Sequence, residues 1–320
     1  MANANSDTFT GAGWIPVDSD PNVILRIRNN SFVENQFNAV PMTTRTKDIP
    51  RAGGVSLGRV GKGDAFGRQT HANDSITMRV DKIGGIVEID EEDIEDSPQD
   101  IIDTKTLEAA DTYSRLLDNA AIGVTAAKAT HGWLFDSLYY TLTQADALTG
   151  YTANSNIVKT GSGGVVTYDL LSQTLGKLEQ SNWFDPSSMV IGAHPFFAQV
   201  LRGIKDSTGR PIFVESSSGG AGGAVGNANL TGMSLFGFPF QWSMGLRTSA
   251  AGTDNPTGNP LLVMGNRNLL RRGDRYGLQV GWQDSTEGTG FDNDVNKLRF
   301  RARKGVAFGA PGAAAILEIG

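Results

Sequence analysis

The sequence predicts an α+β protein, because strand-like segments surround one long helix and are followed by a stretch of mixed helices and strands. Residues 102–124 repeat apolar side chains at helical spacing, whereas residues 75–80 alternate polar and apolar side chains as a strand does. Glycine contributes 40 of the 320 residues, where average usage predicts roughly half that number. Because glycine favours loops and turns over cores, we expect long extended connections.

The composition excludes several kinds of chemistry. The chain has no cysteine, which rules out disulfides, thiolate metal sites and cysteine nucleophiles. The net charge of −6 argues against nucleic-acid binding as the main function, because such binding depends on basic side chains that neutralise phosphates. It does not argue against enclosing DNA, since a closed container needs no attraction for its contents. The first residues lack the regions of a signal peptide, and no stretch approaches the roughly 18 apolar residues of a membrane span. We expect a chain folded in a cytoplasm, without a membrane partner.

The first two segments lack a core of their own. Residues 1–45 are rich in Asn, Asp, Ser and Pro and carry only short apolar patches, so we expect an arm that neighbouring molecules order. Residues 46–82 are expected to form a long hairpin, whose glycine-rich tip carries Arg59, Lys62 and Arg68. Isolated two-stranded ribbons are marginally stable, so this hairpin needs a partner surface.

One helix dominates the next segment. A strand at 86–89 leads into an acidic run at 90–96, and Asp96-Ser97-Pro98 supplies a capping residue and a proline suited to a first helical turn. The apolar repeat then predicts a helix over about 97–127, which at about 1.5 Å per residue spans roughly 45 Å. The acidic run lacks the glycine and alternating ligands of a calcium loop, so we interpret it as the approach to the helix.

An α/β region is expected over 165–285, after a connection at 131–164 that has no assignment. Thr167 is expected to cap a helix, and His194-Pro195 to open another after a short buried strand at 189–191. Turn residues at 205–211 and a low-complexity loop at 216–232 follow. Further strands are expected at 238–242, 261–264, 277–282, 298–301 and 314–319.

No residue pattern proposes a catalytic, cofactor or metal site. Gly54-Val55-Ser56-Leu57-Gly58 matches a nucleophile elbow, but no helix-forming stretch follows it. Gly61-Lys62-Gly63 lacks the spacing of a phosphate loop, and the glycines at 220–226 do not follow a strand. The histidines are far apart and lack a helical two-histidine spacing: His71, His131 and His194.

Five segments, taken in order, resemble a known family. A hydrophobic strand and a helix over 189–204 lead to an Asp-x-x-Gly-Arg turn at 206–210. A Leu-x-Gly-x-Pro strand lies at 235–240, and the strand at 261–266 ends in Gly-Asn where the family has Gly-Asp. Residues 299–316 contain a charged strand, a turn near a proline and an alanine-rich strand. In this order the segments are similar to tailed-bacteriophage major capsid proteins with the Hong Kong 97-like fold.

The resemblance covers the chain from about residue 40 onward and implies a capsid fold with four parts. These are an N-terminal arm, an extended loop, a peripheral domain with a long spine helix, and an axial domain around the capsomer centre. We expect them at 1–45, at 46–82, at 83–130 with 290–320, and at 165–285. The loop at 216–232 is then expected near the capsomer axis, and 131–164 stays unassigned.

The resemblance also implies a structural subunit without catalytic activity. Copies would form pentamers and hexamers that tile an icosahedral head, which encloses double-stranded phage DNA without sequence-specific binding. No long charged helical stretch precedes the arm, so a separate scaffolding protein is expected. Portal and decoration proteins are further implied partners.

The expected mechanism is assembly through heterologous contacts that tolerate small changes of angle. We hypothesise that the basic hairpin tip of one subunit meets the acidic run of another. The alternative is that these charges only keep loops soluble, because exposed ion pairs contribute little. The hypothesis joins Arg59, Lys62 and Arg68 to Asp90, Glu91, Glu92 and Asp93.

Some relatives crosslink their subunits through a lysine, an asparagine and a buried glutamate. Lys62 and Asn296 could take the first two places. The strand at 299–304, however, carries arginines and a lysine where a carboxylate would be needed. We therefore expect no covalent crosslink.

Three other functions remain open at this point. An encapsulin-like compartment shell would keep the fold, although such chains usually begin with a helix rather than an Asn- and Pro-rich arm. A serine hydrolase would have to use Ser56 or Ser162 with His131. A tail or decoration protein would form smaller or tubular assemblies.

Overall fold

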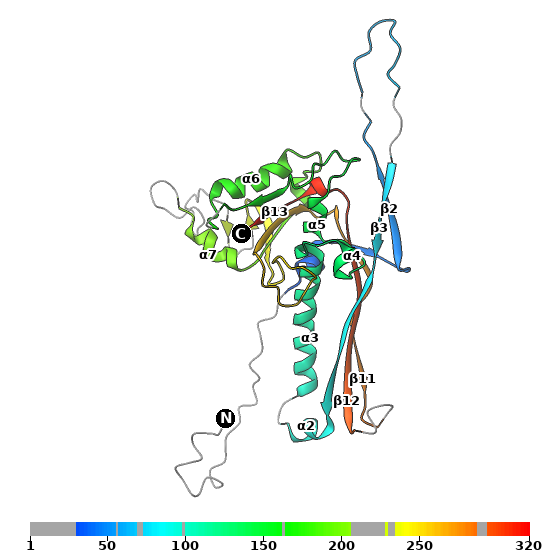
Figure 1. Cartoon of the computed structure of the whole chain (residues 1–320), viewed down its shortest axis with the longest axis vertical. Coiled ribbons are helices and arrows are strands. Elements are labelled where there is room, and N and C mark those ends of the chain that lie inside the picture. The colour runs from blue at the N-terminus through cyan, green and yellow to red at the C-terminus, as the bar shows by residue number, and fades with distance from the viewer. Residues whose placement is uncertain are drawn as a thin grey trace.

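The computed structural model describes residues 30–55, 57–68, 73–97, 100–161, 164–205, 228–229, 234–286 and 293–320. These residues form an elongated molecule with a body near its middle (Figure 1). A two-stranded hairpin projects from one end of the body, and a sheet with a long helix extends from the other. The α+β class predicted from the sequence is confirmed.

Strands and helices alternate irregularly along the chain. The strands are β1 (Asn38–Pro41), β2 (Thr46–Ala52), β3 (Asn73–Arg79), β4 (Asp81–Asp90), β5 (Ile157–Lys159), β6 (Met189–Ala193), β7 (Ala228–Asn229), β8 (Ser234–Leu235), β9 (Phe238–Trp242), β10 (Leu261–Asn266), β11 (Leu270–Gln283), β12 (Val295–Phe308) and β13 (Ala314–Glu318). The α-helices are α1 (Phe32–Gln36), α2 (Glu91–Asp96), α3 (Ile101–Asp118), α4 (Lys128–His131), α5 (Leu138–Thr143), α6 (Tyr168–Glu179) and α7 (Phe196–Gly203). Shorter turns are the π-helical η2 (Asn119–Gly123) and the 3₁₀ turns η3 (Pro186–Ser188) and η5 (Pro311–Ala313).

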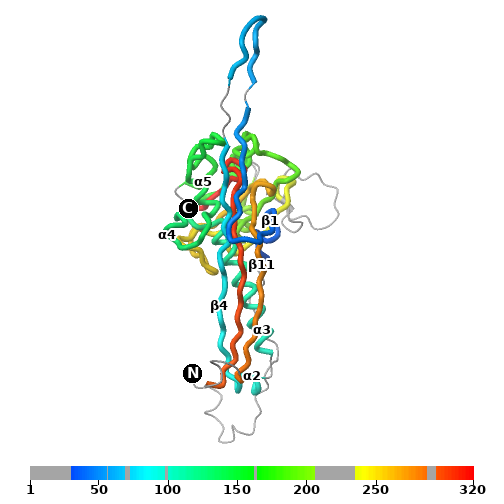
Figure 2. The backbone as a smooth tube through the Cα atoms, turned by 90° about the vertical axis from the view of Figure 1, so that its right-hand side faces the viewer, coloured from blue at the N-terminus to red at the C-terminus, as the bar shows by residue number. Residues whose placement is uncertain are grey.

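The lower part of the molecule is a four-stranded sheet in the order β1-β11-β12-β4. β11, β12 and β4 run side by side as long antiparallel strands (Figure 2). Side chains alternate along β12, so Leu298 and Phe300 are buried whereas Arg299 and Arg301 are exposed. Ala302, on the buried face, shares a hydrophobic core with residues of α3. The helix therefore covers the apolar face of this sheet.

The body contains a seven-stranded mixed sheet in the order β5-β13-β10-β6-β9-β8-β7. Its central strands β6 and β10 are buried along their whole length and read as continuous apolar runs. α6 packs on this sheet through Leu171 and Leu178, and α7 contributes Phe197 and Leu201 to the same core. Thr167 caps α6 as predicted, since its side chain accepts a hydrogen bond from the Leu170 N–H.

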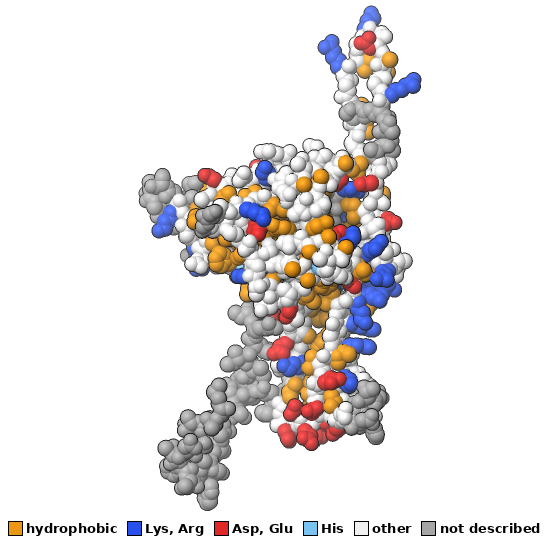
Figure 3. All heavy atoms as spheres, in the orientation of Figure 1, with side chains coloured by type: hydrophobic (Ala, Val, Ile, Leu, Met, Phe, Trp, Pro, Cys, Tyr) orange, Lys and Arg blue, Asp and Glu red, His pale blue; other side chains and the backbone are white. Residues whose placement is uncertain are grey.

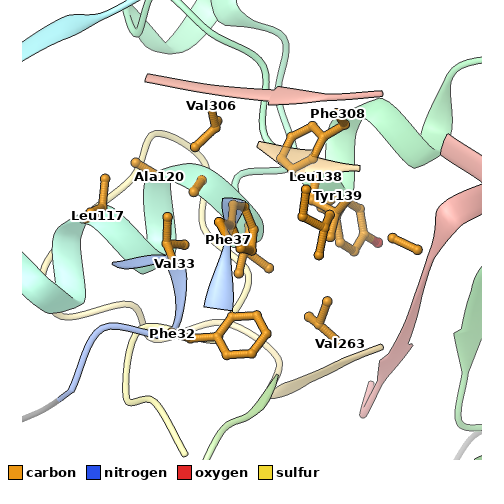
Figure 4. Packing of buried hydrophobic residues seen from close by; sticks show 14 of the residues in the cluster. Phe32, Val33, Phe37, Leu117, Ala120, Leu138, Tyr139, Val263, Val306 and Phe308 are labelled. Atoms are coloured by element: carbon orange, nitrogen blue, oxygen red, sulfur yellow. The ribbon is translucent and has the colours of Figure 1, made fainter. Parts of the chain in front are cut away.

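Residues 30–41 are part of the body rather than an arm that only neighbours could order. Phe32, Val33 and Phe37 are almost fully buried between α3, α5 and the two large sheets (Figure 4). β1 pairs in parallel with β11. The prediction of an arm ordered by neighbours was wrong for residues 30–41. Their apolar side chains are separated by polar ones along the sequence, yet they pack against a surface that the rest of the chain supplies. The remainder of the predicted arm, 1–29, lies outside the described residues.

The long helix differs from its prediction at both ends. Asp100 caps α3 by accepting from the Asp103 N–H, instead of Asp96 or Ser97, and the acidic run itself forms α2. At the other end the helix widens into η2 and stops at Gly123, not at about residue 127. An added Cβ at Gly123 would collide with the Arg247 carbonyl, so a distant segment of the chain passes directly against the last residue of the helix.

The two sheets divide the closing segment of the chain. β12 pairs with β4, most of which lies within 83–130, whereas β13 pairs with β10, which lies within 165–285. The unassigned connection at 131–164 contributes α5 to the core and β5 to the edge of the seven-stranded sheet. The predicted turn at 206–210 and most of the predicted loop at 216–232 lie outside the described residues. The other predicted strands are present, with the bounds given above.

Candidate assembly surfaces

The hairpin places its glycine-rich tip far from the body. β2 and β3 pair antiparallel from Thr46↔Arg79 to Ala52↔Asn73, and the chain between them forms the tip. The base of the hairpin is anchored on the body through a small core, in which Ile49 and Met78 pack with Ala307 of β12. The chain therefore covers the base of the hairpin itself, and only the distal part is left without a partner surface.

One guanidinium group joins the hairpin to the body. Arg51 on β2 donates to Asp74 on β3 and to Asp146 in the loop after α5, with shortest contacts of 2.5 Å to each carboxylate. It also donates to the Gly309 carbonyl at 3.2 Å. Hydrogen bonds and the charge of Arg51 lower the pKa of Asp146 below its ordinary range, although burial acts in the opposite direction. This connection was not predictable from local patterns, because the three partners of Arg51 are distant along the chain.

The tip is both basic and apolar. Arg59, Lys62 and Arg68 are exposed there, as the sequence analysis expected of loop residues. Val55, Leu57 and Phe66 are 75%, 94% and 83% exposed, and they are the three most exposed large apolar side chains in the described residues. These three residues were not predicted as a contact surface, although apolar residues inside a glycine-rich loop were the available signal.

The acidic run lies at the opposite end of the molecule. β4 ends at Asp90, and Glu91, Glu92 and Asp93 form the first turn of α2, where the helix dipole favours negative charge. Asp90, Glu92 and Asp93 are exposed, and Glu91 is partly buried. Carboxylates gather at the lower end in Figure 3, whereas basic side chains stand on the hairpin tip at the upper end. The structure does not bring the two predicted groups together within one chain.

The residues considered for a crosslink occupy a different setting from the one expected. Asn296 is 1% exposed; its side-chain amide donates to the Glu91 carboxylate and its oxygen accepts from the Ser285 N–H. The strand at 299–304 carries no carboxylate, as its sequence shows, but α2 supplies the carboxylate of Glu91 beside Asn296. Both polar groups of Asn296 are already engaged, and an incoming lysine would have to displace them.

A buried carboxylate holds the N-terminal segment in place. Asp118, at the end of α3, accepts hydrogen bonds from the Ser31 and Ser243 hydroxyls and from the N–H groups of Phe32 and Val33. These donors fix the start of α1 against the spine helix. Burial raises the pKa of Asp118 to about 6, while hydrogen bonds from Ser243, Ser31 and the backbone act to lower it.

Only one residue of the hydrolase alternative, His131, belongs to the described part of the chain. Ser56, Ser162 and His71 lie outside the described residues. His131 ends α4, where its Nδ1 accepts from the Trp133 N–H, and burial lowers its pKa. His194 is buried beside Arg247, and its pKa is lowered to about 4 by burial and by that positive charge. Among the described residues no cluster of His, Asp and Glu is suited to a metal ion, and no helix is long and apolar enough to cross a membrane.

Comparisons with known proteins agree with this geometry. Residues 11–319 match the model of the Phage capsid family. The fold is similar to that of a chain in the solved structure of Mycobacterium phage Bobi, with a TM-score of 0.70 and 16% identity over 96% of each chain. It is also similar to Microbacterium phage Oxtober96 (TM-score 0.68, 18% identity, 96% of each chain). The capsid of a native GTA particle gives a TM-score of 0.69 and 15% identity over 100% of this chain and 99% of that one. No curated protein matches the sequence.

The elongated subunit with its projecting hairpin thus shares the fold of a capsid chain. Because the family model covers nearly the whole chain, the protein belongs to the phage capsid family. It is a major capsid protein, and it is located in the virion.

Proposed function

We propose that this major capsid protein forms both pentamers and hexamers, which tile an icosahedral head around a double-stranded DNA genome. One observation carries the proposal: the basic tip and the acidic run lie at opposite ends of one elongated chain. A contact between unlike surfaces joins copies head to tail, and such heterologous contacts close into rings when the rotation permits. The subunit assembles in the bacterial cytoplasm and acts without catalysis.

The proposed contact pairs the tip residues of one subunit with the acidic run of the next. Arg59, Lys62 and Arg68 are exposed and mounted on a long ribbon that reaches well beyond its own body. Among the acidic residues, Glu91 already binds Asn296, so the exposed carboxylates contribute most of the attraction. The contact residues on that side are Asp90, Glu91, Glu92 and Asp93.

The domain roles follow the same scheme. We assign 46–82 to an extended loop, and 83–130 with β12 to a peripheral domain whose spine is α3. We assign 165–285 to an axial domain, except for β11, which lies in the sheet of β12 and β4. β13 and the connection at 131–164 belong with the axial domain because they share its sheet or its core. The arm is 1–45, of which 30–41 is built into the body.

Replacement of the three basic tip residues tests the contact. Arg59, Lys62 and Arg68 changed together to alanine should reduce the yield of particles in negative-stain microscopy and make the remaining particles dissociate at lower salt. The matched control is Arg59→Lys with Lys62→Arg and Arg68→Lys, which keeps every charge and should assemble normally. Unchanged yield and salt tolerance in the alanine variant would show that the pairing is wrong.

The proposed partners of the capsid protein follow from its proposed role in a head that contains DNA. We propose a separate scaffolding protein, a portal and a decoration protein as partners. The alternative of a compartment shell with a protein cargo predicts particles without a genome. Extraction of nuclease-protected double-stranded DNA from purified particles supports the head, and protein cargo in its place supports the compartment.

A further inference from the structure

The four-stranded sheet has one face that the long helix does not cover. α3 packs on the side of β12 that carries Ala302, so alternate residues of the strand point the other way. Arg299 and Arg301 are exposed on that other side, and Arg303 is partly exposed. Figure 2 is seen from this side of the sheet, and Figure 3 shows basic side chains along the same side of the molecule. A row of three arginines thus runs along the middle of an open face.

This row has no carboxylate partners in the part of the chain that the structure describes. Arg299 and Arg303 form no ion pair there. Arg301 donates instead to the neutral side chain of Gln279 at 3.2 Å, and its guanidinium lies 5.6 Å from the centre of the Tyr276 ring. Three positive charges are therefore left for an anion to neutralise.

A fourth cation lies beside the row. Lys82 of β4 stands directly opposite Arg303, and like charges in such a cross-strand pair destabilise a sheet. Among the described residues no carboxylate forms an ion pair with Lys82 either. The free subunit thus carries an unfavourable interaction that a bound anion would relieve.

Glycines keep the row accessible. Arg301 is opposite Gly84 of β4, and Arg299 is opposite Gly281 of β11. The guanidinium of Arg299 lies over Gly281, with its Nη2 3.5 Å from the position that a Cβ would take. Because glycine has no side chain, a ligand can approach these two arginines closely.

The spacing of the arginines matches that of an extended acidic peptide. Successive arginines are two residues apart on one strand, which places them about 6.8 Å from each other. Side chains on one side of an extended peptide recur at the same interval. Carboxylates at alternate positions of such a peptide can therefore each meet one guanidinium, whose planar fork binds a carboxylate through two hydrogen bonds.

Duplex DNA fits this row less well, although arginine also binds phosphate. The phosphates of a duplex wind around it once in about 10 base pairs, so a straight row follows neither strand. A duplex is also stiff and extends past the row. There the acidic run that begins at Asp90 repels phosphates, whereas a short peptide segment ends before it.

We propose that this face of the sheet binds an extended acidic segment of a partner protein. Carboxylates at alternate positions of that segment pair with Arg299, Arg301 and Arg303. The inference goes beyond the proposed function, because it concerns a single subunit and holds whether or not the basic tip and the acidic run join copies.

Binding of short labelled peptides to the unassembled chain tests the inference. The probe is Glu-Ser-Glu-Ser-Glu, and the matched control, Glu-Glu-Glu-Ser-Ser, has the same composition and charge in a different order. In fluorescence anisotropy the alternating peptide should bind at low salt and be released as the salt concentration rises. It should bind at least about threefold more tightly than the control, because all three of its carboxylates face the row.

Substitution of the row should remove this binding. Arg299, Arg301 and Arg303 changed together to alanine should weaken the binding of the alternating peptide by about tenfold or more, because three charge-assisted contacts are lost. The same positions changed to lysine keep the charge but lose the planar fork, so binding should persist while the preference for the alternating peptide falls. Thermal melting of each variant checks that the body is folded.

A charge control and a location readout complete the design. Lys105, Lys128 and Lys177 changed to alanine remove the same charge from other surfaces and should leave the affinity unchanged. A carbodiimide joins a carboxylate to a nearby amine as an amide. Mass spectrometry should therefore find the coupled peptide on Lys82, which lies beside the row.

Three results would overturn the inference: equal affinity for the two peptides, unchanged affinity in the alanine variant of the row, or coupling that spares Lys82. Tighter binding of a short DNA duplex than of the alternating peptide would assign the face to nucleic acid and overturn it as well. Shell formation by the unaltered chain is a separate readout. Shells without peptide binding leave the proposed function intact, and peptide binding without shells removes the proposed function but not this inference.

Discussion

Arg51 and Asp146 connect the projecting hairpin to the body of the subunit, with 2.5 Å between Nη1 and Oδ2. Both side chains are mostly buried, with 16% and 12% of their surface exposed, so the pair is shielded from solvent. The same guanidinium also bridges the two strands through Asp74. The orientation of the hairpin in the free subunit therefore depends strongly on one residue.

Arg51→Ala should loosen the hairpin without unfolding the body. The change leaves Asp146 partly buried without its cation, at a cost of about 1–3 kcal/mol. Hydrogen exchange should accelerate in 46–52 and 73–79 and stay unchanged in β6 and β10. Because the pKa of Asp146 is lowered in the folded chain, the stabilisation is present above about pH 4 and is lost as the pH falls further. Lys105→Ala, which breaks an exposed pair, should cost less than about 0.5 kcal/mol.

Asp118 should make the free subunit less stable as the pH rises from about 4 to about 6. Its pKa is raised to about 6 by burial, so the folded chain binds a proton that the unfolded chain has already released. The pKa of Asp118 in the folded chain lies about two units above its value in the unfolded chain, which corresponds to about 3 kcal/mol of stability. Urea unfolding of the natural chain and of Asp118→Asn, followed from pH 4 to pH 7, should give curves that are not parallel. Parallel curves would assign an ordinary pKa to this carboxyl group.

Phe32→Ala should destabilise the whole body by about 3–5 kcal/mol. The ring is fully buried, and it packs edge-on against Phe37 with 6.0 Å between ring centres. Urea unfolding of the unassembled chain measures the loss. Phe196→Ala is the matched control, since that ring is 43% exposed and should cost much less. Equal small losses in both variants would show that residues 30–37 do not belong to the core.

Gly305→Ala should displace the base of the hairpin from β12. An added Cβ would collide with the backbone carbonyl of Arg79, where the end of β3 crosses this strand. Overpacking of this kind costs about 1–3 kcal/mol. Gly85→Ala in β4 meets no atom within 4 Å and should leave stability nearly unchanged. Thermal melting of the two variants, together with hydrogen exchange in β3, distinguishes the outcomes.

Local patterns in the sequence located most of the elements but not all of their surroundings. The alternation at 75–80, the cap at Thr167 and the continuous apolar run at 189–191 each describe a single element, and the structure confirms all three. The start of α3 was misplaced because several acidic residues in a row can all act as caps. The end of the helix depends on Arg247, which approaches Gly123 from a distant part of the chain.

The contact proposed between the basic tip and the acidic run was also predictable only as far as local sequence patterns reach. Clusters of like charge are visible in the sequence, and the structure places the tip cluster and the acidic run at opposite ends of the molecule. The cleft beside the acidic run, between β4 and α3, was not predictable, because Val87 and Ile101 line it only after these two elements have packed. The carboxylate of Glu91 beside Asn296 likewise depends on the pairing of β12 with β4, which brings together residues about 200 positions apart.

β3 and β4 are separated by Val80 alone, a residue that is 3% exposed. One nearly uninterrupted strand path therefore runs from the hairpin to the acidic run at Asp90. A tilt of the hairpin is therefore transmitted along this path as a mechanical lever instead of being absorbed by a flexible linker.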